Sequence, residues 1–214
     1  MEFFVDSADT ELIKKAYSMG LCDGCTTNPS LIKQAGKDHK KVVQEISSLI
    51  PGPISVEALS ETAEGMVKEG EEYITWGKNI VVKIPMCPEG MKAVKILSKK
   101  KIRTNVTLIF SPLQALIAAK AGATYVSPFV GRLDDIGHVG MDIIAQIKDI
   151  FVQYDFETKI LAASIRHPTH VLEAALIGAD VATVPPDILF KLSNHPLTDS
   201  GMKKFLEDSK AWKK

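Results

Sequence analysis

The chain has 214 residues, of which 45% are hydrophobic, and this is enough for one domain with a full core. Lysine and arginine together number 26, and aspartate and glutamate also number 26, so the formal net charge is zero. This balance argues against a nucleic-acid-binding protein, which would need a clustered basic excess. A few local arginines could still bind an anionic small molecule. No apolar run approaches the roughly 18 residues that a membrane span requires.

The start of the chain and its cysteine count indicate a cytoplasmic protein. Residues Met1 to Phe4 contain no basic region followed by a long apolar stretch, so no signal peptide is expected. Three cysteines are a small, odd number, which is typical of a reducing compartment and not of a disulfide framework.

One pattern recurs along the chain: a short apolar run ends in a polar or charged residue, and an amphipathic stretch follows. The apolar runs, expected to be strands, are Glu2–Asp6, Gly24–Asn28, Ile54–Glu57, Ile80–Lys83, Arg103–Thr107, Tyr125–Phe129, Lys159–Ser164 and Asp180–Val184. The amphipathic stretches, expected to be helices, include Asp9–Met19, His39–Leu49, Ala63–Trp76, Gly90–Ser98, Pro112–Ala121, Gly140–Tyr154 and Pro168–Ile177. Strands that alternate with helices predict a parallel sheet, and mostly apolar strands predict that both sheet faces are covered.

Eight such units in a chain of this length favour the α/β class, as a closed (β/α)8 TIM barrel that forms one domain over residues 1–214. The alternative is an open doubly wound sheet, which is less favoured because no GxGxxG follows the first run. Residues 199–214 are expected to add a C-terminal amphipathic helix with Met202, Phe205, Leu206 and Trp212 on one side. That apolar side needs a partner, which could be a neighbouring subunit or the barrel itself.

Lys83 stands at the end of the apolar run that begins at Ile80. In a strand covered on both faces, a lysine reaches water only at the mouth of a barrel. Burial of an unpaired ammonium is costly and favours the neutral amine, which is a nucleophile toward ketones. The alternative is a lysine at a sheet edge whose amine extends to solvent.

Other strand ends carry polar side chains as well. They are Asp6, Asn28, Glu57, Asn105, Thr107, Ser127 and Ser164. Each one alone is more often a helix cap or a turn former. Together they would ring the C-terminal mouth of one barrel, where barrel enzymes place their active sites. A lysine surrounded by carboxylates, amides and hydroxyls favours a polyhydroxy ketone as the ligand.

Two arginines follow neighbouring strands, Arg132 after the sixth and Arg166 after the seventh. Guanidinium groups on adjacent loops can bind a phosphate together. Either arginine taken alone is better explained by a surface salt bridge with Asp134 or Asp135.

The cysteines and histidines give weak metal signals. Cys22 and Cys25 form a CxxC, but a zinc site needs about four ligands and the only further cysteine is Cys87. A redox pair is the alternative; the motif leads into a strand instead of opening a helix, so we interpret both cysteines as incidental. Among the five histidines only His167 and His170 have a weak metal-like spacing, and we interpret all five as structural.

Several segments together resemble the transaldolases, in particular the short subfamily that also contains the fructose-6-phosphate aldolases. The matching segments are Phe3–Ala8, Cys25–Ser30, Thr62–Met66, Val82–Pro85, Thr104–Thr107 and Ala162–Arg166. The resemblance runs essentially end to end and keeps its order. It implies a class I Schiff-base mechanism on sugar phosphates, with no metal and no organic cofactor. It also implies a homo-oligomer, a pentamer or a decamer, without nucleic-acid or membrane partners.

The resemblance also implies a role for each site residue. Lys83 would form the Schiff base, and Asp6, kept ionised by the nearby cation, would take the proton from the C4 hydroxyl during C3–C4 cleavage. Glu57 and Thr107 would hold a water and transfer protons while the imine forms and hydrolyses. The remaining substrate contacts would be Asn28, Asn105 and Ser127 at the dihydroxyacetone unit, and Arg132, Ser164 and Arg166 at the phosphate.

Two positions favour transaldolase over fructose-6-phosphate aldolase, which releases free dihydroxyacetone. The aldolase group usually has glutamine where this chain has Glu57, and tyrosine where it has Phe129. A tyrosine hydroxyl there could help water to hydrolyse or protonate the intermediate, and phenylalanine cannot. A barrel that binds sugar phosphates without catalysis is an alternative of another class, because fold alone does not imply function.

Overall fold

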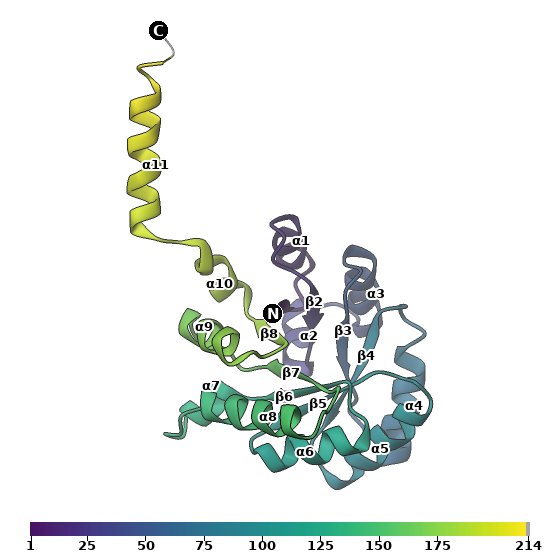
Figure 1. The fold of residues 1–214 in the computed structure, drawn as a ribbon. Coiled ribbons are helices and arrows are strands. Elements are labelled where there is room, and N and C mark those ends of the chain that lie inside the picture. Colours follow the sequence, from purple (N-terminus) through teal and green to yellow (C-terminus); the bar gives the residue numbers. More distant parts are fainter. Residues whose placement is uncertain (213–214) are drawn as a thin grey trace.

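The computed structural model describes residues 1–212 and contains a closed barrel of eight parallel strands in chain order (Figure 1). This confirms the predicted (β/α)8 barrel. The strands are β1 (Glu2–Asp6), β2 (Gly24–Thr26), β3 (Ile54–Glu57), β4 (Ile80–Pro85), β5 (Thr104–Ile109), β6 (Tyr125–Pro128), β7 (Lys159–Ala162) and β8 (Val181–Val184). Because all neighbours pair in parallel, the C-terminal ends of all strands meet at one mouth.

Most of the helices surround the barrel and pack apolar side chains against the outer side of the sheet, whereas α11 does not. They are α1 (Thr10–Ser18), α2 (Pro29–Ala35), α3 (His39–Leu49), α4 (Ala63–Tyr73), α5 (Pro88–Lys99), α6 (Pro112–Ala121), α7 (Val130–Asp134), α8 (Met141–Gln153), α9 (Pro168–Ile177), α10 (Pro186–Leu189) and α11 (Pro196–Ser209), with a 3-10 turn at Phe190–Ser193. No helix within the described part of the chain is long and apolar enough to cross a membrane.

The sequence predicted the long elements but missed the short helices at the mouth. The strands β2, β6 and β7 end before the predicted Asn28, Phe129 and Ser164. The reason is clearest at β2, where Asn28 accepts a hydrogen bond from the backbone N–H of Leu31 at 3.0 Å and caps α2. The short helix α2 is favoured by its cap Asn28 and by Pro29 in its first turn. Neither signal produces a periodic apolar pattern in the sequence, so the helix was not predicted.

The C-terminal helix α11 projects away from the barrel (Figure 1). It begins at Pro196, before the predicted start at 199, and Trp212 lies in a turn beyond its end. Met202, Phe205 and Leu206 are 58%, 73% and 64% exposed, so in the described chain the barrel does not cover them. The predicted helix residues 213–214 lie outside the described residues.

Inside the barrel, every second side chain of a strand points inward, and the layers change from apolar to polar toward the mouth. The lower layer is an apolar cluster that includes Phe4, Val81, Tyr125, Leu161 and Val181. Two residues further along β1 and β4 stand Asp6 and Lys83. The apolar layer therefore forms a dry floor beneath the polar strand ends.

Gly24 makes room for this floor. A Cβ atom at Gly24 would lie 2.6 Å from Cε1 of Phe4, whose side chain is fully buried against the edge of Tyr125. Only a residue without a side chain fits beside this ring.

We expect Gly24→Ala to lower the free energy of unfolding by about 1–3 kcal/mol, because overpacking forces Phe4 or the strand to shift. Gly201→Ala in α11 is the control, since a Cβ there meets no atom within 4 Å. Urea denaturation of both variants measures the effect. Equal midpoints for the two variants would contradict this account of the floor.

Candidate active site

Most of the predicted site residues line one cavity of about 190 Å³ at the mouth of the barrel. Those that the structure brings together there are Asp6, Asn28, Lys83, Thr107, Ser127, Phe129, Arg132, Ser164 and Arg166. Glu57 and Asn105 are not part of its wall. Glu57 borders a neighbouring cavity with Thr27 and His39, and Asn105 is fully buried.

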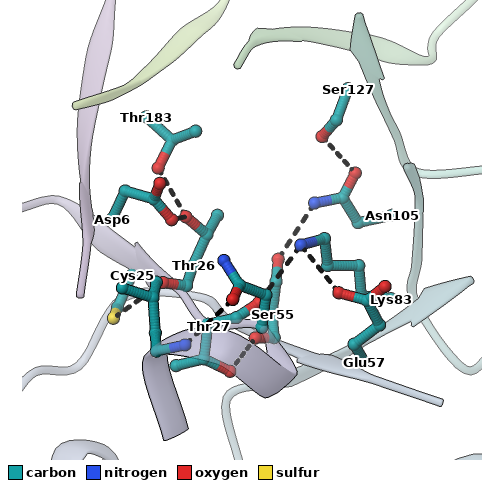
Figure 2. A network of polar contacts seen from close by, with 12 residues as sticks. Asp6, Cys25, Thr26, Thr27, Ser55, Glu57, Lys83, Asn105, Ser127 and Thr183 are labelled. Atoms are coloured by element: carbon teal, nitrogen blue, oxygen red, sulfur yellow. Dashed lines mark hydrogen bonds and ion pairs between the residues drawn. The ribbon is translucent and has the colours of Figure 1, made fainter. Parts of the chain in front are cut away.

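Lys83 is held by two acceptors, one on the neighbouring strand β3 and one just after the end of β2. Its Nζ lies 3.1 Å from Oε2 of Glu57, and it donates a hydrogen bond of 3.2 Å to the backbone carbonyl of Thr27 (Figure 2). Glu57 and Lys83 are register partners on β3 and β4, which explains the contact. The expectation that a buried lysine here would be unpaired is therefore wrong. The side chains are only 7% and 17% exposed, so solvent screens this ion pair weakly.

Asp6 stands apart from this ion pair and accepts a hydrogen bond of 2.7 Å from Oγ1 of Thr26 (Figure 2). Burial raises the pKa of the Asp6 carboxyl above its ordinary 3.8, although the Thr26 hydrogen bond and the charge of Lys83 both lower it. The protonated imine expected on Lys83 would favour the ionised carboxylate, whereas in the free protein burial is the larger effect on this pKa.

Thr26 also fixes the direction of a short hydroxyl chain. Its Oγ1 lies 2.5 Å from Oγ1 of Thr183 on β8. A hydroxyl has one proton to donate, and that of Thr26 goes to Asp6, so Thr183 must donate to Thr26. Thr26, Thr183 and Asp6 all line the cavity, so this side of the wall presents oxygen acceptors to a ligand.

Asn105 is bound on both sides of its amide. Its Nδ2 donates to Oγ of Ser55 at 3.1 Å, and its Oδ1 accepts from Oγ of Ser127 at 2.7 Å (Figure 2). Ser127 lines the cavity and Asn105 does not. In this arrangement Asn105 orients Ser127 instead of facing the cavity itself.

Thr107 presents a free hydroxyl. Its Oγ1 is buried and has no hydrogen-bond partner among residues 1–212, yet the residue lines the cavity. Thr107 lies within a shift in the pairing of β5 with β6, between Val106 and Ile109, and Leu108 in this bulge has a φ of 61°. A bulge turns side chains relative to a regular strand, and a buried hydroxyl without a partner is available to a bound molecule.

The two arginines line the cavity from two neighbouring segments, the helix α7 and the loop after β7. The guanidinium of Arg132, on α7, lies 5.0 Å from the ring centre of Phe129 and forms no ion pair with other residues of the described chain. Arg166 lies in the loop after β7, and its Nη2 is 2.8 Å from Oδ2 of Asp135. The alternative of a surface salt bridge thus holds for Arg166. This pair is about half exposed, so it contributes little and leaves other N–H groups of Arg166 to the cavity.

Sequence reasoning missed Thr26 and Thr183 on the wall of the cavity and Ser55 beneath it. Thr26 is the last residue of β2, two residues before Asn28, and Ser55 lies two residues before Glu57 on β3. Thr183 is the inward residue after Val181 on β8. The period-two alternation could have indicated them, because it marks every inward polar residue and not only the last one.

The histidines and cysteines that gave weak metal or redox signals in the sequence form no such site in the described residues. Among residues 1–212, no group of three or more His, Cys, Asp or Glu side chains is arranged to hold a metal ion. Cys22 and Cys25 are buried free thiols, and burial raises the pKa of Cys22 to about 11, which disfavours the reactive thiolate.

Comparison with known proteins finds similarity along nearly the whole chain. Residues 3–214 match the family described as Transaldolase/Fructose-6-phosphate aldolase. Relatives named probable transaldolase include one from Anaeromyxobacter sp. (strain Fw109-5), 58% identical over all of this chain and 98% of the relative. Another, from Methanococcus maripaludis (strain C7), is 58% identical over 99% of this chain and 98% of the relative. One from Geotalea daltonii is 57% identical over all of this chain and 99% of the relative. The chain therefore belongs to the transaldolase/fructose-6-phosphate aldolase family.

Proposed function

We propose that this chain catalyses the transaldolase reaction through a Schiff base on Lys83. It would move a dihydroxyacetone unit from sedoheptulose 7-phosphate or fructose 6-phosphate to glyceraldehyde 3-phosphate or erythrose 4-phosphate, as in the pentose phosphate pathway. The observation that carries the proposal is a buried lysine amine in a cavity that has Asp6 on its wall and two arginines at its rim.

The contacts of Lys83 suit a nucleophilic amine. Once Glu57 has taken one proton from the ammonium, the neutral amine has two N–H groups and one lone pair, and Glu57 and the Thr27 carbonyl are two acceptors. With both N–H groups engaged, the lone pair is left for the substrate carbonyl. Addition to the ketone forms a carbinolamine, and loss of water then gives the protonated imine.

Glu57 and Thr107 stand on β3 and β5, on either side of the strand that carries Lys83. In our proposal Glu57 first takes one proton from the ammonium of the ion pair, which leaves the neutral amine that adds to the ketone. A second proton passes from the amine nitrogen to the ketone oxygen to give the carbinolamine, and Glu57 then gives its proton to the departing hydroxyl as water leaves. The unpartnered hydroxyl of Thr107 holds this water.

Asp6 acts on the C4 hydroxyl. Removal of that proton lets the C3–C4 bond break, and the electron pair moves into the protonated imine to give an enamine on Lys83. The aldehyde product leaves, an acceptor aldehyde enters, and the same steps run in reverse with Asp6 returning the proton. The raised pKa of Asp6 suits a group that must alternate between base and acid.

The remaining polar groups divide the substrate into two ends. Asn28 and Ser127 would bind the hydroxyls of the dihydroxyacetone unit, with Asn105 holding Ser127 in place. Arg132, Ser164 and Arg166 would bind the phosphate. Phe129 presents an apolar ring to the cavity, which supports transfer over release because it gives water no hydroxyl to act through.

Two further expectations belong to this proposal. A metabolic enzyme of this kind would work in the cytoplasm. The exposed apolar side chains of α11 would be covered in a homo-oligomer, a pentamer or a decamer.

The acceptor dependence of turnover tests the proposal. Purified protein should consume fructose 6-phosphate continuously only when erythrose 4-phosphate is present, and free dihydroxyacetone should stay near background. Equal consumption without acceptor, with dihydroxyacetone released, would make the chain an aldolase. Binding of fructose 6-phosphate without turnover in either condition would make it a non-catalytic sugar-phosphate-binding barrel.

In the same assay, Phe129→Tyr should raise the release of free dihydroxyacetone, because the added hydroxyl can assist water. Phe110→Tyr is the matched control: its ring contacts that of Phe129 at 5.8 Å between centres, but it does not line the cavity. An equal response of the two variants would contradict the role given to Phe129.

The pH profile tests the role of Asp6. The carboxylate is the active form for cleavage, so kcat/KM should fall as the pH drops through the pKa of Asp6. Thr26→Val removes a hydrogen bond that lowers this pKa, so the carboxylate is lost at a higher pH and the acid limb moves upward. In the control Thr27→Val, the lost hydroxyl binds the carbonyl of Ser55 and not Asp6, and the limb should stay in place. An unmoved limb in Thr26→Val would exclude Asp6 as the titrating base.

A further inference from the structure

His170 lies buried between the two segments that carry the arginines. It belongs to the first turn of α9, and its side chain is only 4% exposed. It does not line the cavity, so it can influence a ligand only through other residues.

Both ring nitrogens of His170 are engaged, and only one tautomer satisfies both contacts. The Nδ1 atom accepts a hydrogen bond of 3.3 Å from the backbone N–H of Arg166. The Nε2 atom lies 2.8 Å from Oδ2 of Asp134. A neutral ring with its proton on Nε2 donates to Asp134 and accepts from Arg166. A protonated ring would place a donor against the Arg166 N–H.

The surroundings of His170 favour that neutral ring. Burial lowers the pKa of His170, and the ring of His167, with its centre 3.8 Å away, acts in the same direction. Asp134 and Glu173 oppose this with their negative charges. The lowered pKa is consistent with the tautomer that the hydrogen bonds require.

Asp134 carries the connection to α7. Its Oδ2 faces His170, and its Oδ1 accepts a hydrogen bond of 2.8 Å from the backbone N–H of Gly140. The carboxylate is thus fixed at both ends, and Arg132 lies two residues before it on the same helix. A single imidazole therefore connects the backbone of Arg166 with the helix that carries Arg132.

The start of α7 is also bound to the end of β7. The N–H of Val130 donates to the carbonyl of Ala163 at 3.0 Å, and the N–H of Gly131 donates to that of Ser164 at 3.1 Å. A Cβ on Gly131 would lie 2.2 Å from the Ser164 carbonyl oxygen and 2.6 Å from Cγ of Arg166, so the two segments touch without a side chain between them. With the contacts of His170, α7 and the β7–α9 loop form one unit.

We propose that His170 is a positioning residue for the phosphate end of the substrate. Its imidazole holds the Arg166 backbone and, through Asp134, the helix of Arg132, in the arrangement in which both guanidinium groups meet one phosphate. The inference rests on the proposed function, because it takes the arginines as the phosphate site. Arginines fixed before binding lose less conformational freedom when the ligand arrives, which strengthens binding of a phosphorylated ligand.

The test compares a phosphorylated with an unphosphorylated ligand of the same lysine. Borohydride reduces an imine on Lys83 to a stable amine, and half-maximal labelling is measured against fructose 6-phosphate and against dihydroxyacetone, which lacks the phosphate. In His170→Leu, half-maximal labelling by fructose 6-phosphate should need about tenfold more ligand, as expected for one or two lost hydrogen bonds. Labelling by dihydroxyacetone should change by less than about twofold, because the Lys83 side of the cavity is untouched.

Asp134→Asn is a second, nearly isosteric variant in case His170→Leu does not fold. Its single amide oxygen is needed by the Gly140 N–H, so its NH2 faces Nε2–H of His170 and disfavours the required tautomer. It should shift the fructose 6-phosphate dependence in the same direction. Glu173→Gln is the control, since it removes a charge near His170 without a hydrogen bond to the ring, and should shift neither ligand.

Unchanged fructose 6-phosphate labelling in the folded variants would overturn the inference, and so would an equal loss for both ligands, which would indicate a general structural role. Failure of the proposed function gives a different result: the wild-type protein would then be labelled by neither ligand.

Discussion

The ion pair of Lys83 with Glu57 is the contact on which the proposed chemistry depends. Two charges taken out of water cost several kcal/mol each unless geometry and further hydrogen bonds compensate. Here the register of β3 and β4 brings the two side chains together, and the Thr27 carbonyl adds a second acceptor for the amine. The barrel therefore buries the Lys83 side chain almost completely while its charge stays paired with that of Glu57. The two acceptors hold the Lys83 nitrogen in place, and its remaining position is free to react with the substrate carbonyl.

The apolar floor and the polar mouth follow from the same strand alternation. Phe4, Val81 and Tyr125 fill the interior one inward position below the polar residues of their strands. This apolar layer closes the cavity from below, so a ligand would enter from the mouth, where α7 and the β7–α9 loop carry the arginines. The lysine site is built on strands and the proposed phosphate site on loops and short helices. Loops and short helices are not held in place by strand pairing. The hydrogen bonds of His170 and of the start of α7 hold these segments together instead.

Much of this architecture was predictable because it is encoded locally. The helices His39–Leu49, Pro112–Ala121 and Pro168–Ile177 have the bounds that their periodicity and prolines predict. The polar strand ends identified the mouth, because parallel strands bring their C-terminal ends together. The resemblance of several ordered segments to one family then added a role for each residue, and these roles remain predictions.

The contacts that could not be predicted join residues that are far apart in the sequence. The partner of Lys83 follows from strand register, and a single sequence does not reveal register between strands. The same holds for Asn105, which looks like a ligand-binding amide but gives both sides of its amide to Ser55 and Ser127. The contacts of His170 could not be predicted either, because its two partners, Arg166 and Asp134, are recognisable only once α7 lies against the β7–α9 loop.

The most direct test of the account is to locate the covalent intermediate. The protein is incubated with fructose 6-phosphate, reduced with borohydride and digested, and the modified peptide is sequenced by mass spectrometry. The account predicts a reduced three-carbon adduct on Lys83, absent from Lys83→Met and retained in Lys99→Met, which alters an exposed lysine at the end of α5. An adduct on another lysine, or turnover of fructose 6-phosphate by Lys83→Met, would contradict it.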